Sequence, residues 1–108
     1  MDIQVIIVHF PSCQTWKDIA NLCRINLNPR TIEGTTTPPH SRTFFQTVNI
    51  FKNAVLADEI AAFFELNGIS EDDAQKAVLA LIDLGHFKLI GWTSDRKHAI
   101  IDIGEIQR

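Results

Sequence analysis

The sequence predicts an α+β fold in which an N-terminal strand and helix precede a pair of short helices and a C-terminal β-hairpin. Two observations carry this prediction. Apolar residues recur at helical spacing over 56–84, with a break at Asn67-Gly68 that is typical of a turn between helices. After Gly85 the apolar period changes to the two-residue alternation of strands.

The best-marked element is a helix over 70–84. Ser70 stands three residues before Asp73, the spacing of a capping box, in which both side chains satisfy free backbone N–H groups. Acidic residues in this first turn suit the positive end of the helix dipole. Gly85 then occupies the position of a left-handed C-terminal cap. The apolar stripe of the helix consists of Ala74, Ala77, Val78, Leu81 and Leu84.

The preceding helix begins near Leu56. Its apolar stripe repeats with the same period, and Asn67-Gly68 ends it. Since only Gly68-Ile69 separates this helix from the cap of the next, the two helices must form a sharp pair, as in helix-turn-helix units. The stripe consists of Leu56, Ile60, Phe63 and Phe64.

A hairpin follows the helix pair. Residues 87–93 and 97–103 are rich in β-branched and aromatic side chains, and Ser94-Asp95-Arg96 between them is polar and turn-forming. The run AVLALIDLGHFKLI at 77–90 resembles the end of a recognition helix that continues into the first wing strand of winged helix-turn-helix proteins. This resemblance implies a winged-helix-like unit over 41–104, in which the hairpin is the wing.

The front of the chain is predicted to extend this unit within a single domain, 1–108. Residues 1–30 form a strand-helix extension: the apolar, β-branched run 3–10 is predicted to be a strand, and 13–25 a helix capped by Ser12. Residues 31–40 hold Gly34, several threonines and two prolines, and are predicted to be a loop.

Residues 41–51 fit two structures. Their apolar spacing favours the first helix of a winged-helix trio, but their β-branched and aromatic content also suits a strand paired with 3–10. The helix is the preferred interpretation. The predicted core consists of Val5, Ile7, Trp16, Ile19, Phe44, Val48, Leu56, Ile60, Phe63, Val78, Leu81, Leu89 and Ile101.

Composition indicates an ordinary globular protein whose charge is unevenly distributed. The net charge is −3, but residues 1–53 carry five basic against three acidic groups, whereas 54–108 carry five against ten. No apolar run approaches the roughly 20 residues of a membrane span, and no basic region precedes the apolar start. Two cysteines without a secretion signal point to the reducing cytoplasm.

Two groups of residues are candidate binding sites. The basic hairpin tip could contact nucleic acid, together with two cations elsewhere; the alternative is a solvated turn with ordinary charges. The outer face of helix 70–84 is acidic and carries an exposed leucine, which suits a protein partner, although single exposed leucines are common. The nucleic-acid group is Arg96, Lys97, His98, Lys76 and Arg42, and the partner group is Asp72, Leu79 and Asp83.

Catalytic signals are weak. Cys13 follows His9 by four residues and would lie near a helix start, where a thiolate is stabilised, but a buried thiol is the simpler interpretation. The cysteines lack zinc-site spacing and there is no phosphate-binding glycine loop. We therefore expect no metal, no cofactor and no enzymatic activity.

Three functional hypotheses follow. The first is a winged-helix regulator of transcription that binds DNA, with a homodimer as its expected form, because this fold most often binds nucleic acid. The second is an acidic protein–protein interaction module or inhibitor that uses the same surface, which the charge distribution favours. The third is a small enzyme that uses Cys13.

Overall fold

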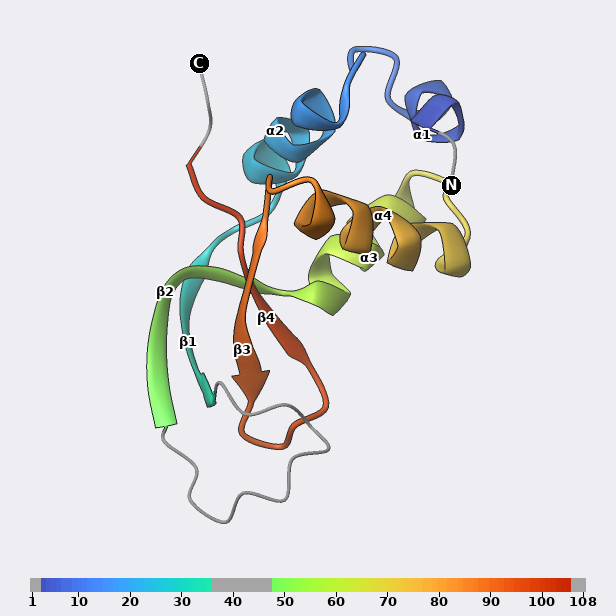
Figure 1. The fold of residues 1–108 in the computed structure, drawn as a ribbon. Helices are drawn as coiled ribbons and strands as arrows, with labels where there is room; N and C mark the ends of the chain where they lie inside the picture. The colour runs from blue at the N-terminus through green and yellow to red at the C-terminus, as the bar shows by residue number, and fades with distance from the viewer. Residues whose placement is uncertain (1–2, 36–47, 106–108) are drawn as a thin grey trace.

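The protein combines four helices and four strands in an α+β arrangement within the residues that the structure describes. The computed structural model describes residues 3–35 and 48–105. Figure 1 shows the helices grouped at one end of the molecule, with the strands extending away from them. The elements in chain order are α1 (Ile3–His9), α2 (Trp16–Asn26), β1 (Arg30–Thr35), β2 (Val48–Leu56), α3 (Ala57–Leu66), α4 (Glu71–Asp83), β3 (Lys88–Thr93) and β4 (Ala99–Asp102).

The four strands form a closed antiparallel sheet in the order β1-β2-β4-β3. Strands β3 and β4 form the predicted hairpin, and β2 pairs with the other edge of β4. The sheet closes where Gly34 and Thr35 of β1 pair with Thr93 and Trp92 of β3. At this seam a Cβ on Gly34 would overlap the Trp92 carbonyl oxygen, so closure requires the glycine.

The predicted helix pair and its turn are confirmed. Ser70 caps α4 by accepting a hydrogen bond from the Asp73 backbone N–H at 3.2 Å. Gly68 and Gly85 adopt positive φ angles of 89° and 84° after α3 and α4, as predicted for C-terminal caps. Helix α2 also matches its prediction, but Thr15 caps it rather than Ser12 and forms a capping box with Asp18.

The core lies where the helices meet the strands. Three phenylalanine rings, Phe10, Phe63 and Phe64, pack with centroids 5.7–5.9 Å apart and join α1 to α3. Leu81 of α4 and Ile101 of β4 are fully buried in the same cluster. Burial of these apolar groups is the main force that holds the helices to the sheet.

Arg24 of α2 is a buried cation in this region, with 7% of its surface exposed. Its Nη1 donates to Asn21 Oδ1 at 2.7 Å and its Nη2 to the His86 carbonyl oxygen at 2.7 Å, while Nε donates to the carbonyl oxygen of Ile103. The guanidinium carbon also lies 5.5 Å from the centre of the Phe87 ring. Arg24 thus connects α2 to the two ends of the hairpin that lie opposite its turn, just before β3 and just after β4.

The strand predicted for 3–10 is wrong, because residues 3–9 form helix α1. Apolar side chains occupy nearly every position of this segment. It therefore presents an apolar face whether it forms a helix, with a period of about 3.6 residues, or a strand, with a period of two. As a helix it places Ile6 in the core, with Phe10 directly after its end, and leaves Val5 and Val8 44% and 77% exposed. Packing against α3 therefore outweighs the strand preference of β-branched residues.

The loop predicted for 31–40 and the helix preferred for 41–51 are also wrong where they can be compared. Residues 30–35 form β1, residues 48–51 belong to β2, and these strands pair with each other. The alternative of a strand paired with 3–10 fails as well, since 3–9 is helical. The strand preference of the β-branched and aromatic side chains in 48–51 outweighs their helical spacing, because β1 is available as a partner strand. Residues 36–47 lie outside the described ranges.

The predicted core is partly confirmed. Val5 and Leu89 are wrong, since each is 44% exposed. Both lie in elements with one face toward solvent, where a shift of one position moves a side chain outward. Phe44 and the side chain of Val48 lie outside the described part of the chain. Ile19, Ile60, Val78, Leu81 and Ile101 are buried, and Ile7, Trp16, Leu56 and Phe63 are half-buried.

In the described ranges, no helix has the length and apolar character that crossing a membrane requires.

Candidate functional site

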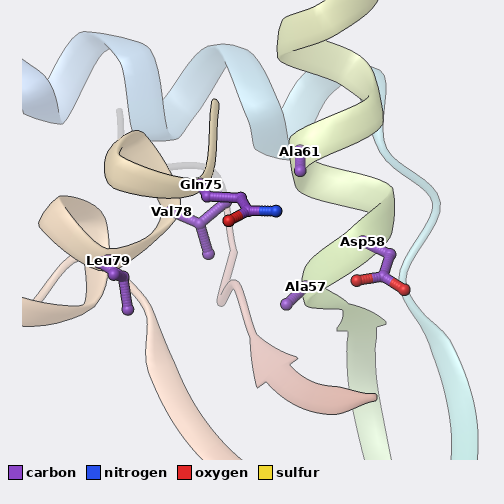
Figure 2. A pocket seen from close by; sticks show the side chains of 6 residues that line it. All are labelled: Ala57, Asp58, Ala61, Gln75, Val78 and Leu79. Carbon is purple, nitrogen blue, oxygen red and sulfur yellow. The ribbon is translucent and has the colours of Figure 1, made fainter. Parts of the chain in front are cut away.

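A hollow of about 240 Å³ lies between α3 and α4. It exists because α3 presents the small residues Ala57 and Ala61 on one face, four residues apart, where larger side chains would fill the space. From α4 it is bordered by residues spaced three and four apart, which also share a face (Figure 2). The lining consists of Ala57, Asp58, Ala61, Gln75, Val78 and Leu79.

Polar groups stand at the edge of this hollow. Figure 2 shows the Gln75 side chain extending from α4 toward α3, with the Asp58 carboxylate at the first turn of α3. The positive end of a helix dipole attracts negatively charged groups to that position. The hollow therefore combines apolar contacts with hydrogen-bond acceptors.

Asp58 also contacts the hairpin. Its Oδ2 lies 2.5 Å from Nδ1 of His98, at ion-pair distance although without the geometry of a hydrogen bond. The Asp58 side chain is 67% exposed and that of His98 40% exposed, although Nδ1 of His98 itself is buried. Such a contact places the hairpin turn beside the helix pair, but it does not bury the carboxylate.

The turn that carries His98 is fixed by short-range hydrogen bonds. The Thr93 N–H donates to the His98 carbonyl oxygen at 2.9 Å, and the Thr93 hydroxyl and the Lys97 N–H both donate to Asp95 Oδ1. The hydroxyl of Thr93, followed by the Lys97 N–H, holds the pKa of Asp95 below its ordinary value of 3.8. The turn therefore presents its basic residues from a defined backbone.

The predicted nucleic-acid group is spread over several surroundings. Lys97 is exposed at the hairpin turn, Arg96 is half-buried there with a φ of 63°, and His98 contacts Asp58. Lys76 is exposed on α4. Arg42 lies outside the described ranges. Of this group, the structure brings together the three hairpin residues.

The predicted partner group lies on α4, where all three side chains are exposed. Leu79, 60% exposed, lines the hollow, whereas Asp72 and Asp83 do not. Asp58 and Gln75, which also line the hollow, were not predicted from the sequence. The pair of alanines four residues apart was the available signal, but it acquires meaning only when α4 is known to face it.

A second hollow, of about 390 Å³, lies beside the segment from Asn26 to Arg30. Arg30 Nη1 and Glu59 Oε1 form an ion pair across it at 2.6 Å, and Glu59 Oε2 accepts a hydrogen bond from the Leu56 N–H at 2.7 Å. Glu59 is thus engaged in holding β1 to the start of α3. Asp58, which borders the first hollow, is more exposed than Glu59, and its contact is with His98 of the hairpin turn.

Cys13 does not have the surroundings of a nucleophile. Its side chain is buried, with 3% exposed, and burial raises the pKa of its thiol above 9.0, whereas nucleophilic cysteines need a lowered value. Burial likewise raises the pKa of Cys23 to about 12. Among residues 3–35 and 48–105, no three His, Cys, Asp or Glu side chains cluster as metal ligands would.

Comparisons with protein-family models, with curated proteins and with solved structures find no match to this chain. The site must therefore be interpreted from its own chemistry, which is that of an apolar hollow edged by acceptors.

Proposed function

We propose that this protein is a small non-catalytic regulatory module that binds a protein partner through the α3–α4 surface. The observation that carries the proposal is the open hollow of about 240 Å³ with Leu79 exposed at its edge. Protein interfaces concentrate their binding energy where a few side chains fill such pockets and exclude water. An exposed leucine beside an unfilled apolar hollow provides that kind of contact.

The charge of the helix pair supports a protein rather than a nucleic acid as the ligand of this surface. Residues 57–83 contain seven carboxylates and one lysine, a net charge of −6. Phosphates dominate the affinity of proteins for DNA, and an acidic helix would repel them. A basic protein surface would instead be attracted.

The arrangement of elements supports a winged-helix type for this module. Helices α3 and α4 are followed directly by the hairpin β3–β4, and β2 flanks the hairpin beside β4. The fold would then use α2 as its first helix, in place of residues 41–51. Residence in the reducing cytoplasm belongs to the same proposal and is supported by the free thiols of Cys13 and Cys23.

The partner proposal is tested by peptide selection against two variants. Peptides that bind the wild-type protein are selected from a displayed random library, and their affinities for Leu79→Glu and Leu66→Glu are measured by fluorescence anisotropy. Leu66 is the matched control, because it is an 87% exposed leucine on α3 that does not line the hollow. We expect Leu79→Glu to weaken binding on the order of tenfold or more, as for a central interface residue, and Leu66→Glu to leave it unchanged. Equal effects of both variants would refute the proposed surface.

DNA-linked transcription regulation, with the protein as a homodimer, is the second candidate function. The observation that favours it is the exposure of Lys97 beside Arg96 at the hairpin turn, where a wing could reach phosphates. This function does not require the acidic helix face to approach DNA.

The DNA hypothesis is tested by salt titration of binding to random duplex DNA. Under it, Arg96→Glu/Lys97→Glu should weaken binding steeply and reduce the salt dependence of the binding that remains, since fewer phosphate contacts release fewer counterions. Lys17→Glu/Lys52→Glu, which changes two exposed lysines away from the turn, is the control with the same change in net charge. Absence of wild-type binding at low salt would eliminate this function.

A further inference from the structure

The α3–α4 hollow has the size of a site for one inserted side chain. Its volume of about 240 Å³ is below the range of roughly 300–1,000 Å³ in which pockets bury a whole small molecule. It is also open to solvent, and Leu79 in its lining is 60% exposed, so a side chain from a partner surface can reach it. A side chain from a protein is therefore a better occupant than a free metabolite.

The lining selects the chemistry of that side chain. Ala57, Ala61 and Val78 offer an apolar surface, whereas Asp58 offers a carboxylate and Gln75 a side-chain amide at the edge (Figure 2). Long basic side chains bury their aliphatic stems along apolar surface and keep the charged end among polar groups. An aliphatic stem with a cationic end therefore matches both parts of the lining.

Asp58 retains the capacity to accept from such a cation. It contacts His98 through Oδ2, but an ionised carboxylate has two oxygens and accepts several hydrogen bonds. Its side chain is 67% exposed, so a donor can approach from solvent. By contrast, Glu59 next to it uses both oxygens within the fold, toward Arg30 and the Leu56 N–H.

The surrounding charge acts in the same direction. The helix pair carries seven carboxylates against one lysine, which contributes negative charge around the hollow. Acidic surfaces attract basic partners and repel acidic ones, which contributes specificity and speed of association.

We propose that the α3–α4 hollow binds an arginine side chain presented by a basic segment of the partner protein. This inference rests on the proposed function and specifies its ligand. Arginine fits better than lysine because its planar guanidinium has five donors in a geometry that matches a carboxylate such as that of Asp58. Guanidinium is also less strongly hydrated than ammonium, and arginine is enriched at protein interfaces.

The test compares two peptides that differ in charge but have nearly the same shape. The probes are acetyl-Gly-Leu-Arg-Leu-Gly amide and the same peptide with citrulline, whose urea group is neutral. Each is titrated into the ¹⁵N-labelled protein, and binding is followed by amide chemical shifts. We expect the arginine peptide to shift the amides of 57–61 and 75–79, and to bind more tightly than the citrulline peptide on the order of threefold to tenfold.

The variants Asp58→Asn and Asp83→Asn separate a specific contact from general attraction. Each removes one negative charge from the helix pair, but Asp83 does not line the hollow. We expect Asp58→Asn to abolish the preference for arginine over citrulline and Asp83→Asn to preserve it. Equal binding of the two peptides, equal effects of the two variants, or absence of shifts at 57–61 would each overturn the inference.

These outcomes can be distinguished from failure of the proposed function. If selected peptides depend on Leu79 yet bind without regard to Asp58 or arginine, the α3–α4 surface remains a partner site and the arginine assignment is wrong. If no peptide depends on Leu79, the proposed function itself fails.

Discussion

Arg24 and Asp58 contact opposite ends of the same hairpin, in very different surroundings. Arg24 is buried, and its guanidinium donates to the carbonyl oxygens of His86 and Ile103, just before β3 and just after β4. Asp58 is two-thirds exposed and contacts His98, at the turn end. Hydrogen bonds to a buried charge contribute much more than an exposed ion pair. One contact therefore holds the fold together, whereas the other remains available to a ligand.

The largest effect predicted from this comparison is that of Arg24→Ala. The change leaves buried carbonyl oxygens without their donors, and we expect a loss of about 2–4 kcal/mol of unfolding free energy. For a domain of this size, the melting temperature should fall on the order of 10 °C. Urea and thermal denaturation measure both quantities.

Two further variants sharpen this prediction. Lys17→Ala, an exposed position on the same helix, should leave stability nearly unchanged. The unfolding free energy of Arg24→Lys should lie between those of wild type and Arg24→Ala. An ammonium group keeps the charge, but it cannot reach all three acceptors as a planar guanidinium does. An Arg24→Ala protein as stable as the Lys17→Ala protein would show that the buried network adds nothing.

The contrast also shows which parts of the molecule the sequence could predict. Helix α4 was predictable because its signals are local: Ser70 caps it, Gly85 ends it, and its apolar residues keep one period between them. The hairpin was predictable for the same reason, from alternating side chains around a polar turn. Local signals of this kind need no knowledge of distant partners.

Helix α1 and strand β1 could not be predicted in this way. The α1 segment is apolar at nearly every position, so its composition favours a strand, and the helix is selected by the packing of Ile6 and of the following Phe10 into the core. Strand β1 contains Gly34 and polar residues, and its structure depends on pairing with β2 and β3. In both cases contacts distant in sequence decide the structure.

The candidate site was predictable only in part. Leu79 was identified from its position on the outer face of α4, and the structure places it beside the hollow. Asp58 was not identified, because its significance arises from the proximity of Gln75 and His98, which belong to other elements. A hollow is a property of two facing surfaces, so one helix alone does not reveal it.

A smaller effect is expected at the start of α2, the helix that carries Arg24. The Asp18 carboxylate accepts hydrogen bonds from the Gln14 and Thr15 N–H groups at 2.9 and 3.1 Å, which lowers its pKa below 3.8. A carboxyl group with a lowered folded-state pKa stabilises the protein above its unfolded-state pKa, and this contribution is lost as the pH falls through the folded-state pKa.

Asp18→Asn should therefore reduce stability at pH 6, and the difference from wild type should shrink below pH 3.8. Urea denaturation at a series of pH values measures this difference in unfolding free energy. Asp72→Asn is the control, as another exposed acid in the first turn of a helix. A difference between wild type and Asp18→Asn that stays constant from pH 6 to pH 2.5 would contradict the cap's role.

The smallest effect on stability is expected at Asp58, where the comparison with Arg24 is most direct. Because the Asp58 side chain is two-thirds exposed, Asp58→Asn should cost less than about 1 kcal/mol, and a double-mutant cycle with His98→Gln should give a coupling below that value. The measurement is urea denaturation of the four proteins at pH 7. A coupling as large as the loss in Arg24→Ala would mean that this contact also holds the fold together. Asp58 would then be a structural anchor, and its exposed carboxylate would be less available to an arginine from a partner.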